Sequence, residues 1–184
     1  MRRLIVFNMM TLDGFIAGPN GEINWHHVDG EFNEFAIAQL DTIGSLLFGR
    51  VTYELMAGYW PTTEAINDDA EVANRMNRLS KLVFSHTLNE ATWQNTRLVK
   101  GDASTEVARL KEQPGNDLFV FGSGKLVASL MQNGLIDEFR LIINPVVLGH
   151  GQSMFGDVQQ PLALKLEQSR AFGNGNMLLY YEVP

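Results

Sequence analysis

The chain has 184 residues, of which 45% are hydrophobic and 19% are charged, so it is long enough for one domain with a substantial core. The formal net charge of −7 and the lack of a basic block argue against a nucleic-acid-binding surface. Cysteine is absent, which excludes disulfides, iron–sulfur clusters and thiolate zinc sites. The four histidines form no HExxH or HxH pair, so we expect no metal site. We find no linker or internal repeat and expect a single domain, residues 1–184.

The first apolar run, Leu4–Phe7, is short and is interrupted by Asn8. It is too brief for the hydrophobic region of a signal peptide, and no later run approaches the length of a membrane span. The sequence therefore favours a soluble cytoplasmic protein without a membrane partner.

The first two thirds of the chain alternate predicted strands and predicted helices. Short apolar, β-prone runs predict strands, and apolar residues at helical spacing predict helices. The expected strands are 4–9, 45–48, 81–85, 96–99 and 118–121. The expected helices are 30–41, 52–57, 68–79, 104–111 and 125–132, with Ser104 as a candidate N-cap. The turn residues of 17–25 predict a loop after the first strand.

The last third reads as strands, at 138–144, 163–169 and 177–183, with a hairpin signal at Gly173–Gly175. We expect these strands to form an antiparallel meander. The order of the elements predicts an α/β fold of three layers, α/β/α, around a mixed, mostly parallel sheet with a C-terminal antiparallel hairpin.

Three of the predicted strands end in loops that suit a phosphate-bearing ligand: "GRVTYE" from Gly49, "SHTL" from Ser85 and "GSGKL" from Gly122. If the strands are parallel, the three loops lie along one edge of the sheet, where ligands bind in such folds. Glycines let the backbone amides at a helix start face a pyrophosphate.

Each side chain in these loops also has a plainer interpretation. Arg50 offers a planar fork for phosphate oxygens, but a lone arginine is more often a surface charge. Thr52 could turn its hydroxyl towards an anion or simply cap a helix. His86 could be a donor or a solvated loop histidine. The recurrence of such loops after three strands favours a phosphate-bearing ligand.

The third loop is neither of the two best-known phosphate motifs. Lys125 is followed by Leu126, where a P-loop needs Ser or Thr, and Phe119 stands at the position of the first P-loop glycine. Val127 replaces the third glycine of the Rossmann fingerprint. An ATP-dependent transferase is therefore disfavoured.

Several segments together resemble the dihydrofolate reductase-fold family, with particular similarity to the C-terminal reductase domain of bacterial riboflavin biosynthesis and its single-domain relatives. The matching segments are "TLDGFIAGPNGEINW", "LLFGRVTYE", "KLVFSHTL" and "LFVFGSGKLVASLMQNGLIDEFRLIINPVVLGHGQSMF". The resemblance covers nearly the whole chain and implies a sheet of the dihydrofolate reductase type.

The resemblance also implies NADPH as cofactor. It would place Gly49, Arg50, Val51 and Thr52 at the adenosine-side phosphates and Ser85 and His86 near the 2′-phosphate. It would place Gly122, Ser123, Gly124, Lys125 and Leu126 around the pyrophosphate, and Asn8, Ile16 and Ala17 along the nicotinamide and its ribose. Neither of the first two loops offers an obvious acid for a free 2′-hydroxyl, which agrees with NADPH over NADH.

Hydride transfer to a C=N bond also needs a proton, so we looked for a positioned acid. In dihydrofolate reductase the helix after the first loop carries a buried carboxylate, and Glu31 lies nearest that position, with Asp29 close by. Both could instead cap the helix start. His150 is an alternative donor or a solvated loop residue.

For a flat substrate, the predicted pocket residues are Asp13, Phe32, Tyr53, Trp60 and Phe155, although Asp13 could chiefly organise its turn. The function expected is an NADPH-dependent reductase of a small pterin-, pyrimidine- or flavin-like heterocycle or imine. The alternative is a non-catalytic NADPH-binding or other nucleotide-binding regulatory module of the same fold. The apolar stretch "LIINPVVLG" could be a homodimer seam or a buried central strand.

Overall fold

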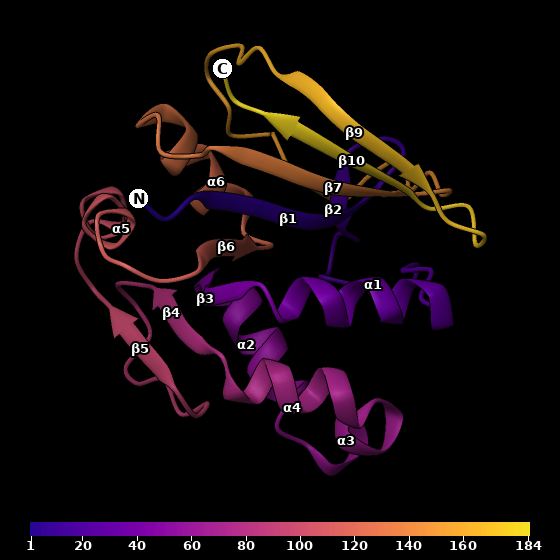
Figure 1. Cartoon of the computed structure of the whole chain (residues 1–184), viewed down its shortest axis with the longest axis horizontal. Coiled ribbons are helices and arrows are strands. Elements are labelled where there is room, and N and C mark those ends of the chain that lie inside the picture. Colours follow the sequence, from indigo (N-terminus) through magenta and orange to yellow (C-terminus); the bar gives the residue numbers. More distant parts are fainter.

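The computed structural model describes residues 1–184 as an eight-stranded sheet with helices on both faces (Figure 1). The strands lie in the order β5-β4-β3-β6-β1-β7-β10-β9. Their bounds are β1 Leu4–Thr11, β3 Ile43–Gly49, β4 Ser80–Phe84, β5 Thr96–Val99, β6 Asp117–Phe121, β7 Glu138–Asn144, β9 Lys165–Ala171 and β10 Met177–Glu182. The first six strands of this order pair in parallel, and β10 and β9 add antiparallel pairs. The expected α/β class with a mostly parallel sheet is confirmed.

The C-terminal strands are arranged differently from the expected meander. β10 lies beside β7, and β9 forms the outer edge, so β9 does not touch β7. After β7 the chain runs through residues 145–164 and returns to the sheet as β9, at its outer edge beside β10. The hairpin at Gly173–Gly175 joins β9 to β10 as expected.

The chain forms six helices: α1 Gly30–Leu40, α2 Arg50–Tyr59, α3 Thr63–Asp68, α4 Ala70–Arg78, α5 Ala103–Lys111 and α6 Gly124–Gln132. Buried residues of α5 and α6 pack on one face, and those of α1, α2 and α4 pack on the other. Strands that are buried on both faces carry continuous apolar runs, which explains why these runs in the sequence predicted the strands. None of the helices combines the length and the apolar character that spanning a bilayer requires.

Three predicted helix starts were wrong in detail. The helix expected over 68–79 begins at Ala70, because Asp69 accepts a hydrogen bond from the Val72 amide and so ends α3 and caps α4. The cap of α5 is Asp102 and not Ser104. α2 begins at Arg50 after Gly49, so Thr52 lies inside the helix and is not its N-cap.

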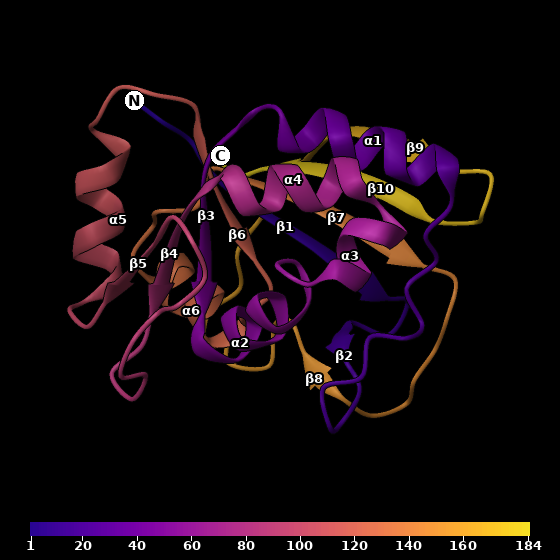
Figure 2. The same ribbon diagram turned by 90° about the horizontal axis from the view of Figure 1, so that it is seen from below.

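Two short strands form a second sheet that the sequence did not predict. β2 Phe15–Ala17 pairs with β8 Gln152–Ser153, and Figure 2 shows the pair beyond the end of β1, away from α5. Strands of two or three residues carry no readable periodicity. This small sheet holds the segment after β1 against the segment that follows β7.

Candidate functional site

The loops after β3 and β6 meet at the carboxyl edge of the sheet. The Gly49 amide donates to the Ser123 hydroxyl across 2.8 Å, and the Ser123 and Thr52 hydroxyls lie 3.0 Å apart. The starts of α2 and α6 are therefore in direct contact. The register of the parallel strands produces this meeting, since Leu46 pairs with Phe119 and Leu47 with Val120.

These two helices are the ones whose first turns lack a side-chain cap. Asp29, Thr62, Asp69 and Asp102 each accept a backbone amide at the starts of α1, α3, α4 and α5. No side chain does this at the starts of α2 and α6. Uncapped N-terminal amides and the aligned helix dipoles attract anions, so two such ends together form a pair of anion-binding termini.

The backbone between β6 and α6 is tightly confined. Gly122 has φ +63°, and a Cβ atom there would collide with the Thr52 side chain. Ser123 also adopts a left-handed conformation, φ 59°, which costs a non-glycine residue on the order of 1 kcal/mol. A Cβ on Gly124 would lie 3.0 Å from the Ser153 carbonyl oxygen. These contacts fix the glycine loop against α2 and β8.

Asn8 ties this loop to the centre of the sheet. Its side chain is buried in β1, where Oδ1 accepts the Gly122 amide at 2.5 Å and Nδ2 lies 3.0 Å from the Met154 sulfur. Ile16 and Ala17 lie on β2, which continues from the same end of β1. Asn8 thus joins β1, the glycine loop and the segment after β8.

The second loop, after β4, meets α2 across an open cavity of about 600 Å³. The cavity is lined by Arg50, Glu54, Thr87, Leu88, Asn89 and Glu90. Arg50 pairs with Glu54 at 2.8 Å on the exposed side of α2. Ser85 accepts the Thr87 and Leu88 amides and so shapes its own turn. His86 is exposed in this turn and does not line the cavity.

The remaining predicted cofactor residues lie in two environments. Val51 and Lys125 are exposed on the first turns of α2 and α6. The Leu126 side chain is buried in the core, so only its backbone can face a ligand. This distribution agrees with contacts made mainly by backbone amides.

The predicted acids have structural partners. Glu31 is exposed and accepts hydrogen bonds from the Gly173 amide at 2.9 Å and from Arg170 at 2.7 Å. These bonds, with the Gly173 amide as the larger cause, lower the pKa of the Glu31 carboxyl. Asp29 accepts the Phe32 amide as the N-cap of α1. The predicted match to a buried carboxylate therefore fails, since Glu31 is an exposed, ionised anchor for the β9–β10 hairpin.

The predicted pocket aromatics do not surround one space. Phe32 packs with Phe172 in the core beneath α1, and Tyr53 is 3% exposed with its hydroxyl accepting the Trp93 amide. Trp60 packs on the α2–α4 side, whereas Phe155 packs against Phe139 on the α6 side. Phe32 and Tyr53 therefore serve the core, which corrects their prediction as pocket walls.

Asp13 joins the turn after β1 to the loop after β7. It accepts the Thr11 hydroxyl at 2.6 Å and the Leu148 and Gly149 amides at 3.2 and 2.7 Å. The Thr11 bond is the main cause that lowers the pKa of Asp13. Asp13 thus organises a loop that includes the exposed His150.

Sequence reasoning missed the asparagines that hold the loop between β2 and α1. The buried Asn144 accepts the His27 amide at 2.8 Å and donates to the Met10 carbonyl at 3.3 Å. Asn176 donates to the His27 carbonyl at 2.8 Å. The available signal was a polar residue at the end of an apolar strand. These bonds position the loop that leads from β2 towards α1.

Comparisons with known proteins agree with this architecture. Residues 2–178 match the RibD C-terminal domain family. The chain is 38% identical to the uncharacterized protein YyaP of Bacillus subtilis (strain 168), over 98% of this chain and 94% of YyaP. It is 26% identical to the uncharacterized protein YwjB of the same organism, over 97% of each chain.

Two crystal structures have the same fold. A protein from Shewanella sp. PV-4, provisionally assigned to riboflavin biosynthesis, has a TM-score of 0.76 at 23% identity and 99% coverage of both chains. The diaminohydroxyphosphoribosylaminopyrimidine deaminase/5-amino-6-(5-phosphoribosylamino)uracil reductase of Thermotoga maritima has a TM-score of 0.70 at 14% identity, over 100% of this chain and 57% of that one.

The fold is that of an α/β protein with two uncapped helix starts in contact at the carboxyl edge of its sheet. The chain belongs to the RibD C-terminal domain family, and this membership suggests a reductase-like role.

Proposed function

We propose that this protein is an NADPH-dependent reductase that transfers a hydride to a small pterin-, pyrimidine- or flavin-like heterocycle or imine. The observation that carries the proposal is the contact between the uncapped starts of α2 and α6. Family membership supports the reductase class.

In this proposal the pyrophosphate would lie against the amides of Ser123 and Gly124 and the first turn of α2, while the Gly122 amide is held by Asn8. The donors fit a polyanion, because they are backbone amides at two helix N-termini, and an added Cβ on Gly122 would obstruct the loop. Arg50 would face the 2′-phosphate side at the cavity between α2 and the 87–90 turn, which Glu54 and Glu90 also line. Asn8, Ile16 and Ala17 would position the nicotinamide ring, which would supply the hydride when NADPH is bound.

Reduction of a C=N bond also requires one proton at nitrogen for every hydride added to carbon. Glu31 and Asp29 are committed to the hairpin and to the α1 cap, so the proposal takes this proton from solvent water. The chain's contribution to chemistry is then the placement of two rings and the exclusion of competing geometries.

Titration of the protein with NADPH and NADH, followed by quenching of tryptophan fluorescence, tests the cofactor. We expect saturable binding with a clear preference for NADPH. Absence of binding at millimolar NADPH would contradict the proposal. Loss of NADPH absorbance with a panel of pterins, pyrimidines and flavins then tests turnover.

The structural contacts of Glu31 and Asp29 favour one alternative, a regulatory module that binds NADPH without turnover. That module predicts the same fluorescence titration but no oxidation with any member of the panel. The absorbance assay therefore separates the two functions.

A further inference from the structure

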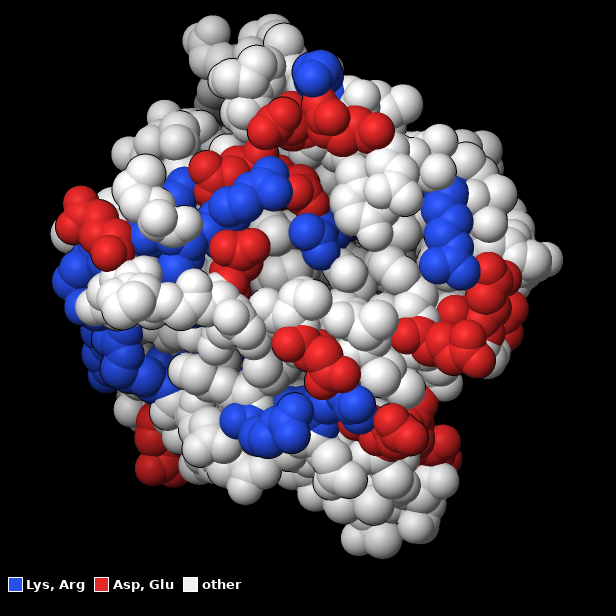
Figure 3. Space-filling model, in the orientation of Figure 1, with Lys and Arg blue, Asp and Glu red and all other residues white.

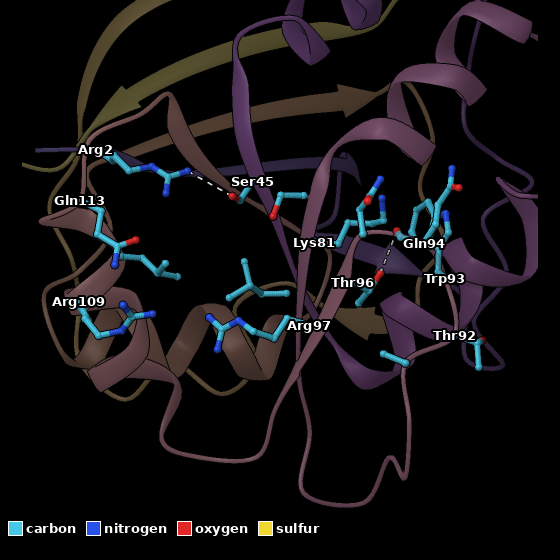
Figure 4. Close-up of a pocket in the computed structure, with 15 residues that line it drawn as sticks. Arg2, Ser45, Lys81, Thr92, Trp93, Gln94, Thr96, Arg97, Arg109 and Gln113 are labelled. Carbon is cyan, nitrogen blue, oxygen red and sulfur yellow. Dashed lines mark hydrogen bonds between the residues drawn. The ribbon is translucent and has the colours of Figure 1, made fainter.

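A second cavity, of about 710 Å³, lies at the opposite edge of the sheet. It is formed by the amino ends of β3, β4 and β5, the turn before β5 and one side of α5 (Figure 4). Its lining includes the cationic residues Arg2, Lys81, Arg97 and Arg109 and no aspartate or glutamate. All the charged residues that line this cavity are cationic, although the chain has a net charge of −7. Such a lining favours an anionic ligand.

Arg2 is the buried cation of this cavity. It is 8% exposed, and its guanidinium donates to the Asn116 carbonyl at 2.5 Å and to the Ser45 hydroxyl at 3.3 Å. No carboxylate lies within salt-bridge distance of it. Burial lowers the pKa of Arg2, and Asp117, beyond salt-bridge distance, offsets only part of this effect, so an anion in the cavity would stabilise the arrangement.

Arg97 and Arg109 bring two more guanidinium groups from β5 and α5. Both bind the same carboxylate, Glu106, with Arg109 making two hydrogen bonds of 2.7 and 3.0 Å. Two cations share one acid, so one positive charge is left over. Their side chains are about half exposed, which leaves guanidinium edges open to a ligand. Figure 3 shows basic side chains gathered on the side of the molecule that α5 and β5 form.

Lys81 affects the electrostatic potential of the cavity and has no donor left for a ligand. Its ammonium donates to the Met76, Asn77 and Leu79 carbonyls at 2.8, 3.1 and 2.6 Å and lies 4.4 Å from the centre of the Trp93 ring. All three of its donors are thus used within the protein. The charge remains beside the cavity and raises its positive potential.

From these features we infer that the amino-edge cavity is a second binding site, for a small molecule that carries two or more phosphate groups. Planar guanidinium forks match phosphate oxygens in pairs, and three of them line this space. The volume suits a small molecule. The site is separate from the α2–α6 cradle, because it lies at the amino ends of strands whose carboxyl ends carry Gly49 and Ser85.

Isothermal titration with inorganic pyrophosphate and with ADP tests this inference. The variant is Arg97→Gln/Arg109→Gln. The control is Arg75→Gln/Arg78→Gln, because both of these arginines pair with Asp41, and Arg75 also with Glu71, away from the cavity. We expect the control to bind both ligands as wild type does. In the Arg97/Arg109 variant, one of the wild-type binding events should weaken by at least about tenfold. Binding at the α2–α6 cradle is untouched by either pair of substitutions, so the difference reports on this cavity alone.

The two ligands identify what the site recognises. Equal affinity for pyrophosphate and ADP supports recognition of the phosphates alone, and tighter ADP binding supports an added nucleoside contact. The inference is wrong if the Arg97/Arg109 variant keeps the number and affinity of wild-type binding events. It is equally wrong if the control loses as much affinity as the variant, or if neither ligand binds wild type at millimolar concentration.

Discussion

Gly122 and Gly134 have the same backbone conformation, φ +63°, in different surroundings. A Cβ on Gly122 would collide with Thr52, whereas a Cβ on Gly134 would meet open space. Both changes to alanine carry the strain of a left-handed residue, about 1 kcal/mol. The Gly122→Ala change alone disturbs the proposed pyrophosphate loop.

We therefore predict that Gly122→Ala raises the Kd for NADPH by at least about tenfold, while Gly134→Ala leaves it near the wild-type value. Fluorescence titration of both variants measures this. Equal affinity in the two variants would show that the loop after β6 does not contact the cofactor.

His26 is a half-buried base whose Nε2 atom is itself buried. Its Nε2 atom makes no hydrogen bond, and burial lowers its pKa from 6.5 to about 4. Between these values the unfolded chain binds a proton that the folded chain does not, so stability falls as pH falls from 6.5 towards 4. The loss attributable to His26 is up to about 3 kcal/mol.

Denaturant unfolding of wild type and His26→Gln at pH 7 and pH 4.5 checks this prediction, since the variant should show a smaller loss on acidification. An identical loss in both proteins would remove His26 as the cause.

At the scale of elements, Glu31 joins α1 to the β9–β10 hairpin through Arg170 and the Gly173 amide. We predict that Glu31→Gln and Arg170→Gln each lower stability slightly and that their double variant loses less than the sum. A thermal-unfolding double-mutant cycle measures this coupling. In the same variants turnover should persist, and a specific collapse of kcat in Glu31→Gln alone would restore the catalytic assignment.

The sequence predicted most central elements because they are buried on both faces. β7 was expected at its observed bounds, 138–144, and β5 at 96–99. The boundary at Asp69 was missed because one aspartate serves two helices, and the helical pattern continues across it. β8 was missed because pairing with β2 depends on a return of the chain that local pattern does not encode.

For the site, motif spacing found the loops but not their neighbours. Gly49, Thr52, Gly122 and Ser123 were selected from their places after strands, and the structure brings them into contact. The partners of Glu31 lie about 140 residues along the chain, in the hairpin. Contacts of such separation follow from the sheet order, which one sequence does not specify.

At the scale of the whole molecule, the side of β7 and β10 that faces away from α1 carries apolar rows. Ile143 pairs with Met177, and Leu141 pairs with Leu179. Successive side chains of a strand point to opposite faces of the sheet. These four residues therefore lie on the other face from Ile142 and Leu178, which pack under α1. The edge strand β9 is exposed along its whole length. On this face Leu141 is buried, Ile143 and Leu179 are half-buried and Met177 is exposed. A partly exposed apolar face beside an open edge favours association of two copies.

We predict a homodimer through this face. Sedimentation should give a dimer for wild type and a monomer for Met177→Glu, while Ile66→Glu, an equally exposed apolar position on α3, should remain a dimer. A monomeric wild type would contradict the prediction.

A crystal structure grown with NADPH would locate the cofactor on the protein without relying on turnover. We predict the pyrophosphate between the first turns of α2 and α6, in contact with the amides of Ser123 and Gly124, and the nicotinamide beside Asn8. Pyrophosphate bound away from these helix starts would contradict it.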